Sequence, residues 1–154
     1  EDFGGAYGTL IAYRSALAAQ EGFTIYLRNN NDLVLYLGAG GSGLINTKGK
    51  IQKNQWAHLA FTRKDGHFRI FVNGELIWGR QGYNGSVEGG DGYNLFLGCN
   101  PKAGGCHYYK GMMDEVRISK NAKYTTNFSP STFERKLVLK LSPEYYYDPD
   151  RLSD

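Results

Sequence analysis

The chain has 154 residues, of which 41% are hydrophobic and 21% charged, so it is long enough to bury one core but not two. Its formal net charge of +3 is small, and its lysines and arginines are scattered among acids, which argues against a nucleic-acid-binding protein. No apolar run approaches the roughly 18 to 20 residues that cross a bilayer, and residues 1–5 lack the pattern of a signal segment. We therefore expect a soluble single domain whose partners include neither nucleic acid nor a membrane.

Apolar and polar residues alternate over short stretches, which predicts an all-β protein. The 21 glycines and 12 tyrosines fit short strands that are joined by many tight turns. After the first strand, Ala16 to Gln20 is expected to form one helical turn at most. In chain order, we expect strands at Gly8 to Tyr13, Gly22 to Arg28, Leu33 to Gly38, Ala57 to Arg63, His67 to Asn73, Glu75 to Trp78, Asn94 to Gly98 and Lys110 to Ser119.

The clearest local prediction is a three-stranded meander between Trp56 and Trp78. Asp65-Gly66 and Asn73-Gly74 each separate alternating runs, which is the strongest short-range signal for a hairpin. Trp56 is expected to anchor the core or a turn of this meander. Side-chain alternation divides the meander into two faces. The expected core face carries Leu59, Phe61, Phe68, Ile70 and Val72, and the opposite face carries His58, Ala60, Thr62, Arg69 and Phe71.

Three ordered segments then carry a resemblance to a known family: Asn54 to Arg63 (NQWAHLAFTR), Phe71 to Gly74 (FVNG) and Gly111 to Ile118 (GMMDEVRI). In order and spacing they resemble the laminin-G-like, concanavalin A-like jelly-roll family. The resemblance covers most of the span from Gly8 to about Thr132 and implies an antiparallel β-sandwich. We therefore expect residues 1–133 to form the sandwich, and residues 134–154 to form a C-terminal strand and tail that contacts other subunits.

One departure from the family bears on assembly. Members usually begin with two or three further strands before the segment that corresponds to Gly8-Thr9-Leu10-Ile11, and these are absent here. Uncovered strand edges seek partners, so we expect another chain, or another part of this one, to complete the sandwich. The alternating segment Lys136 to Leu141 either fills part of that gap or reaches a neighbour.

The end of the chain indicates a location. Residues Asn121 to Phe133 resemble the tail of such domains in bacteriophage structural and fibre proteins, which implies a virion surface or another extracellular setting. The aromatic and acidic stretch Tyr145 to Asp150 is expected to dock on a partner subunit, with a disordered terminus as the alternative.

The resemblance also raises the possibility of glycoside hydrolysis, which needs two carboxylates facing one sugar. Asp114 and Glu115 are neighbours, and neighbouring side chains on a strand point to opposite faces. The alternating pattern Glu-x-Asp-x-Glu is absent from the sequence. We therefore expect no enzyme activity.

Asp114 matches an acid that is typical of the resembled family, where such an acid fixes a turn or helps to hold calcium. Calcium needs about six to eight oxygen ligands, so a structural hydrogen-bonding role is favoured. Asp91, Asn94 and Asn100 are the candidate helpers if calcium binds. No other cofactor is expected.

Cys99 and Cys106 enclose a six-residue loop between two expected strands. A disulfide across this loop would suit an extracellular or particle-surface protein, and two buried free thiols are the alternative. A zinc site with His107 is less favoured, because only three ligands cluster.

Aromatic rings that stack on sugars, beside amides and carboxylates that bind hydroxyls, would mark a glycan site. The candidates are Trp78, Tyr83, Asn84, Asp91 and Tyr93, followed by Tyr108 and Tyr109. The alternative is that these rings simply cover the core. We therefore expect a non-catalytic binding or assembly module with glycan recognition, or a purely structural protein that contacts subunits and binds no sugar.

Overall fold

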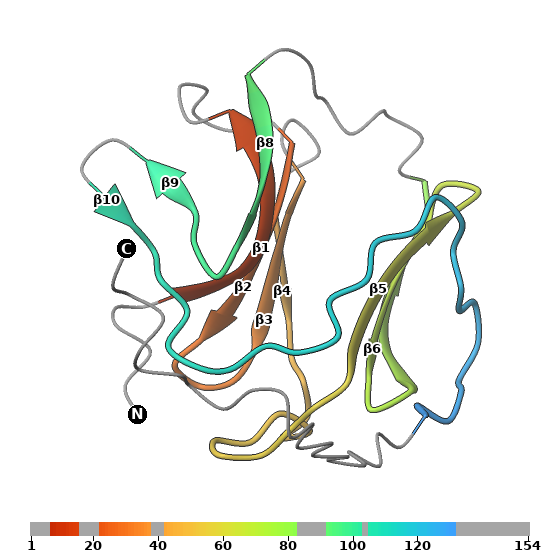
Figure 1. Cartoon of the computed structure of the whole chain (residues 1–154). Helices are drawn as coiled ribbons and strands as arrows, with labels where there is room; N and C mark the ends of the chain where they lie inside the picture. The colour runs from red at the N-terminus through yellow and green to blue at the C-terminus, as the bar shows by residue number, and fades with distance from the viewer. Residues whose placement is uncertain (1–6, 16–21, 38–41, 83–91, 103–104, 132–154) are drawn as a thin grey trace, which may run out of the picture.

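The computed structural model describes residues 7–15, 22–37, 42–82, 92–102 and 105–131. Within these residues the protein is all-β, which confirms the predicted fold class: two antiparallel sheets face each other across a shared core, and a short hairpin lies beside them (Figure 1). The described residues contain no helix that is long and apolar enough to span a bilayer. The strands are β1 (Tyr7–Ser15), β2 (Phe23–Arg28), β3 (Leu33–Leu37), β4 (Ser42–Ile45), β5 (Leu59–Lys64), β6 (His67–Val72), β7 (Glu75–Arg80), β8 (Tyr93–Leu97), β9 (Pro101–Lys102) and β10 (Gly105–Cys106).

The larger sheet has the order β4-β3-β2-β1-β8, so β4 and β8 form its two edges. Every second residue of β2 and β3 points inward, as strand geometry requires. The core cluster contains Leu10, Ile25, Leu27, Leu33, Leu35, Leu37, Ile45, Ile51, Ile70 and Val72. The core therefore draws mainly on the larger sheet, and the smaller sheet covers it from the other side.

The smaller sheet is the predicted meander, with the order β5-β6-β7. Its two turns have positive φ at both central residues: Asp65 and Gly66 at 51° and 71°, and Asn73 and Gly74 at 51° and 80°. Two-residue hairpins of the primed type require this arrangement. The predicted core face is confirmed, because Ile70 and Val72 belong to the core cluster and the other three predicted residues pack against it.

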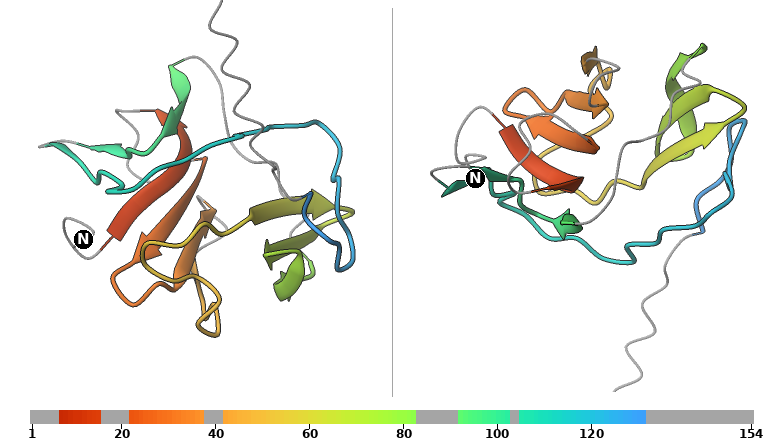
Figure 2. Two further views of the ribbon diagram at one scale, coloured as in Figure 1. Left: turned by 60° about the horizontal axis from the view of Figure 1, so that its bottom comes forward. Right: turned by 90° about the horizontal axis from the view of Figure 1, so that it is seen from above.

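Residues 119–131, which we call the strap, cover the outer face of this meander. Both the front view and the view from above show the strap along the outside of β5 and β6 (Figures 1 and 2). The strap is tied down by hydrogen bonds from Phe128 N to Gly74 O at 2.9 Å and from Thr62 Oγ1 to Tyr124 O at 2.9 Å. Phe71 is fully buried beneath it. The face that was expected to lie away from the core is therefore covered as well.

The predicted strand at residues 110–119 is wrong. This segment forms no strand in the structure, and all of its residues are exposed. A strand needs a neighbouring backbone to complete its hydrogen bonds, and no strand of the described residues pairs with this segment. Strands β4, β9 and β10 were not predicted from the sequence, and the helical turn expected at residues 16–20 lies outside the described residues.

Candidate functional site

The edge strand β8 carries two leucines that point inward but remain exposed. In the ladder between β8 and β1, Leu97 pairs with Ile11 and Leu95 with Tyr13. Ile11 in turn pairs with the core residue Ile25 on β2, so both leucines share the inner face of the sheet. Ile25 is only 3% exposed, whereas Leu95 is 44% and Leu97 47% exposed. The inner face is therefore covered over β2 and β3 and open over β8.

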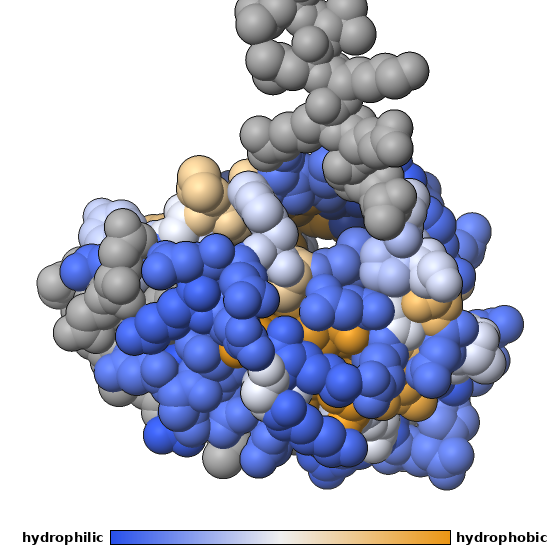
Figure 3. Space-filling model, turned by 90° about the horizontal axis from the view of Figure 1, so that it is seen from below, coloured by the Kyte–Doolittle hydropathy of each residue, from blue (hydrophilic) through white to orange (hydrophobic). Residues whose placement is uncertain are grey.

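The segment that follows the β9–β10 hairpin adds more apolar surface. Met112, Met113, Val116 and Ile118 are 75%, 40%, 51% and 64% exposed. Met113 lies against the end of β8, because its Cε would be 3.3 Å from a Cβ placed on Gly98. We call these four residues, together with Leu95 and Leu97, the open half of the sandwich. Seen from below, hydrophobic surface lies between two hydrophilic parts of the molecule (Figure 3).

Two strand edges border this region. β8 ends the larger sheet and β5 ends the smaller one, so no strand of the described chain pairs with the outer edge of either. Monomeric proteins rarely leave a large apolar patch exposed, and open strand edges are templates for pairing with another chain. The open half therefore has the chemistry of an interaction surface.

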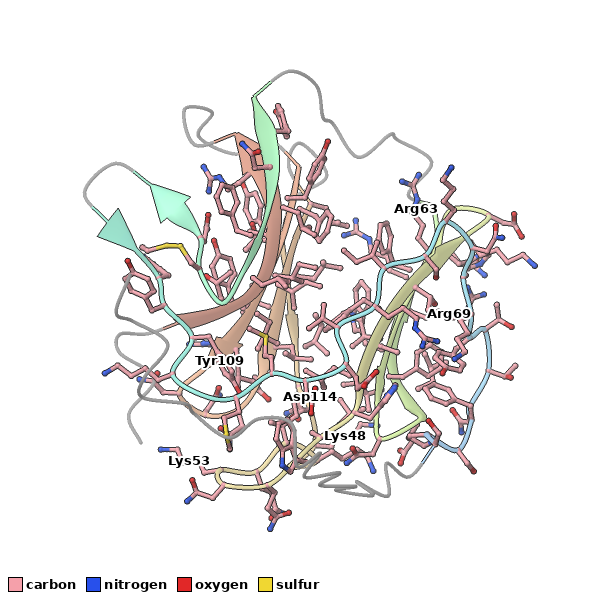
Figure 4. All side chains as sticks on the ribbon, viewed as in Figure 1. Lys48, Lys53, Arg63, Arg69, Tyr109 and Asp114 are labelled. Carbon is pink, nitrogen blue, oxygen red and sulfur yellow. A yellow bond between two sulfur atoms is a disulfide. The ribbon has the colours of Figure 1, made fainter. Side chains whose placement is uncertain are left out.

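Residues 107–118, which we call the crossing segment, run from the β9–β10 hairpin toward the smaller sheet (Figure 1). The disulfide between Cys99 and Cys106 fixes the start of this segment, and it appears as a yellow bond beside β9 and β10 (Figure 4). The two Cα atoms are 5.7 Å apart, within the usual range for such bonds. Next to it, His107 O accepts a hydrogen bond from Thr9 N at 3.2 Å, which ties the loop to β1. Cysteines joined in this way offer no thiolate to zinc.

Asn100 lies inside the disulfide loop and is 4% exposed. Its Oδ1 accepts a hydrogen bond from Arg14 Nη1 at 3.0 Å, and its Nδ2 donates to the hydroxyl of Tyr26. An amide oxygen that faces a guanidinium group is unsuited to a cation, so Asn100 does not fit the calcium ligand set considered for it.

Asp114 lies on the exposed crossing segment (Figure 4). Its Oδ1 accepts a hydrogen bond from Glu115 N at 2.9 Å, and Glu115 has a φ of 50°. Short polar side chains commonly bond nearby backbone in this way at turns. Asn94 donates its amide to Gly92 O at 3.3 Å, and Asp91 lies outside the described residues. No group of three or more histidine, cysteine, aspartate or glutamate side chains in the described chain could hold a metal ion.

The glycan candidates do not gather at one place in the described structure. Trp78 lies on β7 and packs half-buried against the core, whereas Tyr93 lies on β8 in the other sheet with its ring centroid 5.6 Å from that of Tyr13. Tyr109 also packs against the core (Figure 4), and burial raises the pKa of its hydroxyl. Tyr108 is 64% exposed. Tyr83 and Asn84 lie outside the described residues, as does Asp91.

The two tryptophans have exchanged their expected roles. Trp56 was predicted to anchor the core or a turn, yet 59% of its surface is exposed, so the prediction of a core position is wrong. Trp56 precedes β5 by three residues and therefore lies outside the meander, where the alternation of inward and outward positions no longer applies.

An aromatic cluster that was not predicted from the sequence lies under the strap. The ring centroids of His58 and Phe128 are 5.4 Å apart, and those of His58 and Tyr124 6.3 Å apart, both edge to face. Burial lowers the pKa of His58, and the positive charge of Lys123 lowers it further. The signal that could have revealed the cluster is Phe71, a large apolar side chain on the face opposite the expected core face.

Comparison with known proteins yields one match. Residues 4–125 match the sequence model of the concanavalin A-like lectin/glucanases superfamily, and the match covers most of the chain. The chain belongs to this superfamily. Its sandwich architecture and its position in the superfamily agree, and the superfamily name covers both sugar-binding proteins and glycan-cleaving enzymes. No curated protein and no solved structure matches the chain.

Several carboxylates of this superfamily member already have structural partners. Asp32 Oδ1 accepts a hydrogen bond from Thr47 N at 3.1 Å, and Glu75 forms an ion pair with Lys50. Asp114 and Glu115 are adjacent in the chain.

Proposed function

We propose that the chain is a non-catalytic assembly module that binds neighbouring subunits through the open half of its sandwich. One observation carries the proposal: Leu95 and Leu97 point inward on an edge strand, yet nearly half of each remains exposed. Burying such a half-exposed leucine contributes roughly 1 kcal/mol. The six side chains of the open half therefore offer several kcal/mol to a partner that covers them.

A non-catalytic role is supported by the carboxylates. Glycosidases need two carboxyl groups about 5 to 10 Å apart on either side of one bond. Asp32 and Glu75 are engaged by Thr47 and Lys50, and Asp114 bonds the backbone of its own neighbour. These contacts are typical of structural carboxylates.

The setting that we propose is the surface of a virus particle or fibre. Residues 121–133 resemble the tails of such domains in bacteriophage structural proteins, and in the structure residues 121–131 form most of the strap that covers the meander. The disulfide between Cys99 and Cys106 is typical of proteins outside the reducing cytosol.

The test is the association state of the full chain, measured by size-exclusion chromatography with light scattering at rising protein concentration. We expect the wild type to associate and the double variant Leu95→Lys, Leu97→Lys to remain monomeric. Leu76→Lys is the matched control, because Leu76 is 38% exposed but lies on β7. A wild type that stays monomeric at every concentration would contradict the proposal.

Glycan recognition is the second candidate, supported by the exposure of Tyr108 beside the disulfide loop and of Trp56. Tyr108→Ala and Trp56→Ala variants, compared with wild type on a glycan array, test it. Loss of a wild-type signal in these variants would support glycan recognition. An array on which the wild type gives no signal would contradict glycan recognition.

A further inference from the structure

We infer that the open half receives one β-strand, residues 136–141 of a second copy of this chain, which pairs antiparallel with the outer edge of β5. The inference rests on the proposed assembly function and names the partner segment. It is carried by two segments that border the open half and that no described strand pairs with, by the length and alternation of residues 136–141, and by the position of Ser131.

The occupant that fits is an extended strand, because exposed apolar side chains and backbone that no described strand pairs with border the same region. The outer edge of β5 is not paired with any described strand, and neither is the segment 111–119. This segment runs from the end of β8, where Met113 lies against Gly98, toward β5, where Tyr124 O accepts a hydrogen bond from Thr62. One strand added beside β5 would offer hydrogen bonds to both backbones.

Such a strand would also complete the core. Val116 and Ile118 are spaced two residues apart, as are Leu95 and Leu97, so each pair falls on one face of an extended chain. Once segment 111–119 is held as a strand, Val116 and Ile118 can cover the inner face of β8. The exposure of all four side chains is then explained by one missing element.

Residues 136–141 (KLVLKL) fit this place. They number six, as β5 does, and they alternate so that Leu137, Leu139 and Leu141 share one face. Lys136 and Lys140 lie on the other face.

The position of Ser131 favours a second copy over the same copy. Phe128 N bonds Gly74 O, and Asn73 N bonds His58 O at 2.8 Å. The described chain therefore ends close to His58, one residue before β5 begins. Four residues lie between Ser131 and Lys136, so the five Cα-to-Cα steps that join them span at most about 17 Å.

An antiparallel strand would have to begin at the far end of β5, beside Lys64, about 17 Å from its start. The chain's own segment would reach that point only with a fully taut linker. All strand pairings in the described structure are antiparallel. A segment from a neighbouring copy has no such restraint, and exchange of one element between identical chains is a low-cost route to association.

The first test compares two neighbouring positions of the donor segment in the full-length chain. Leu139→Lys places a charge on the apolar face, whereas Val138→Lys adds the same residue to the opposite face. We expect Leu139→Lys to weaken association at least about tenfold and Val138→Lys to leave it within about twofold, as measured by sedimentation.

The second test is complementation. The Leu95→Lys, Leu97→Lys chain has a defective acceptor and an intact donor, whereas Leu139→Lys has the reverse. Each variant alone is expected to be monomeric, and an equimolar mixture is expected to form a heterodimer in native mass spectrometry. The heterodimer would also show that both variants fold.

The other outcomes separate the two proposals. If the wild type stays monomeric and Leu139→Lys only lowers its melting temperature, the segment docks within its own chain and the inference is overturned. If Leu95→Lys, Leu97→Lys prevents assembly but Leu139→Lys does not, the assembly function stands and the donor is another segment. A wild type that is monomeric, with both variants equally stable, overturns both.

Discussion

Tyr124 and Phe128 stack face to face, with ring centroids 3.5 Å apart and planes 5° from parallel. Both rings meet Phe71 edge to face, at 6.4 Å and 5.4 Å. This pair is what makes residues 119–131 a cover for the smaller sheet. Four predictions test this cover and the features around it.

Phe128→Ala should lower the free energy of unfolding by about 2 to 3 kcal/mol, since it removes a half-buried ring and uncovers Phe71. Urea denaturation measures the change. Thr126→Ala, at an exposed position in the same strap, is the control and should change stability by less than about 0.5 kcal/mol. Equal stability of the two variants would mean that the strap does not stabilise the sheet.

Gly74→Ala should be far more destabilising than Gly49→Ala. Both glycines have positive φ, 80° and 70°, so both substitutions strain the backbone by about 1 kcal/mol. A Cβ on Gly74 would also collide with the carbonyl oxygen of Phe128, whereas one on Gly49 meets nothing within 4 Å. The melting temperature of Gly74→Ala should therefore be clearly lower than that of Gly49→Ala. Similar melting temperatures would contradict the close contact between Gly74 and the strap.

Stability should fall as the pH drops below neutral because of His58. Burial and, to a lesser degree, Lys123 lower the pKa of His58 in the folded state below its ordinary value of 6.5. The unfolded chain therefore binds a proton more readily than the folded chain. The contribution to stability is complete above about pH 6.5 and is lost as the pH falls through the folded pKa.

Urea unfolding between pH 8 and pH 5 measures this dependence. His58→Gln should flatten the curve over that range. Lys123→Ala should reduce the loss of stability at acid pH, because removing this positive charge raises the pKa of His58 toward its ordinary value. An unchanged curve in His58→Gln would assign the pH dependence to other groups.

Reduction of the disulfide should lower the free energy of unfolding by about 2 kcal/mol, because Cys99 and Cys106 close a short loop with a sequence separation of 7. The melting temperature with and without reductant measures this. In the Cys99→Ser, Cys106→Ser variant, reductant should have no effect. A wild type that is insensitive to reductant would show that the hydrogen bond from Thr9 to His107 is sufficient to hold the loop.

The sequence by itself determined the parts of this protein that depend on neighbours in the chain. Asp65-Gly66 and Asn73-Gly74 form hairpins because these residue types tolerate positive φ, which is a property of the local backbone. The core face of the meander follows from the same cause, since successive side chains of a strand point to opposite faces. The strand positions of β1 to β3 and β5 to β8 were predicted to within one or two residues at each end.

Only the tertiary structure decided the features that depend on remote partners. Residues 111–119 alternate in part like a strand, but a strand exists only where another strand pairs with it, and no strand of the described residues pairs with this segment. Trp56 is exposed and Trp78 packs against the core because burial depends on which sheet lies opposite. The same reason separates Leu95 from Ile25: both point inward, but only Ile25 has a second sheet above it.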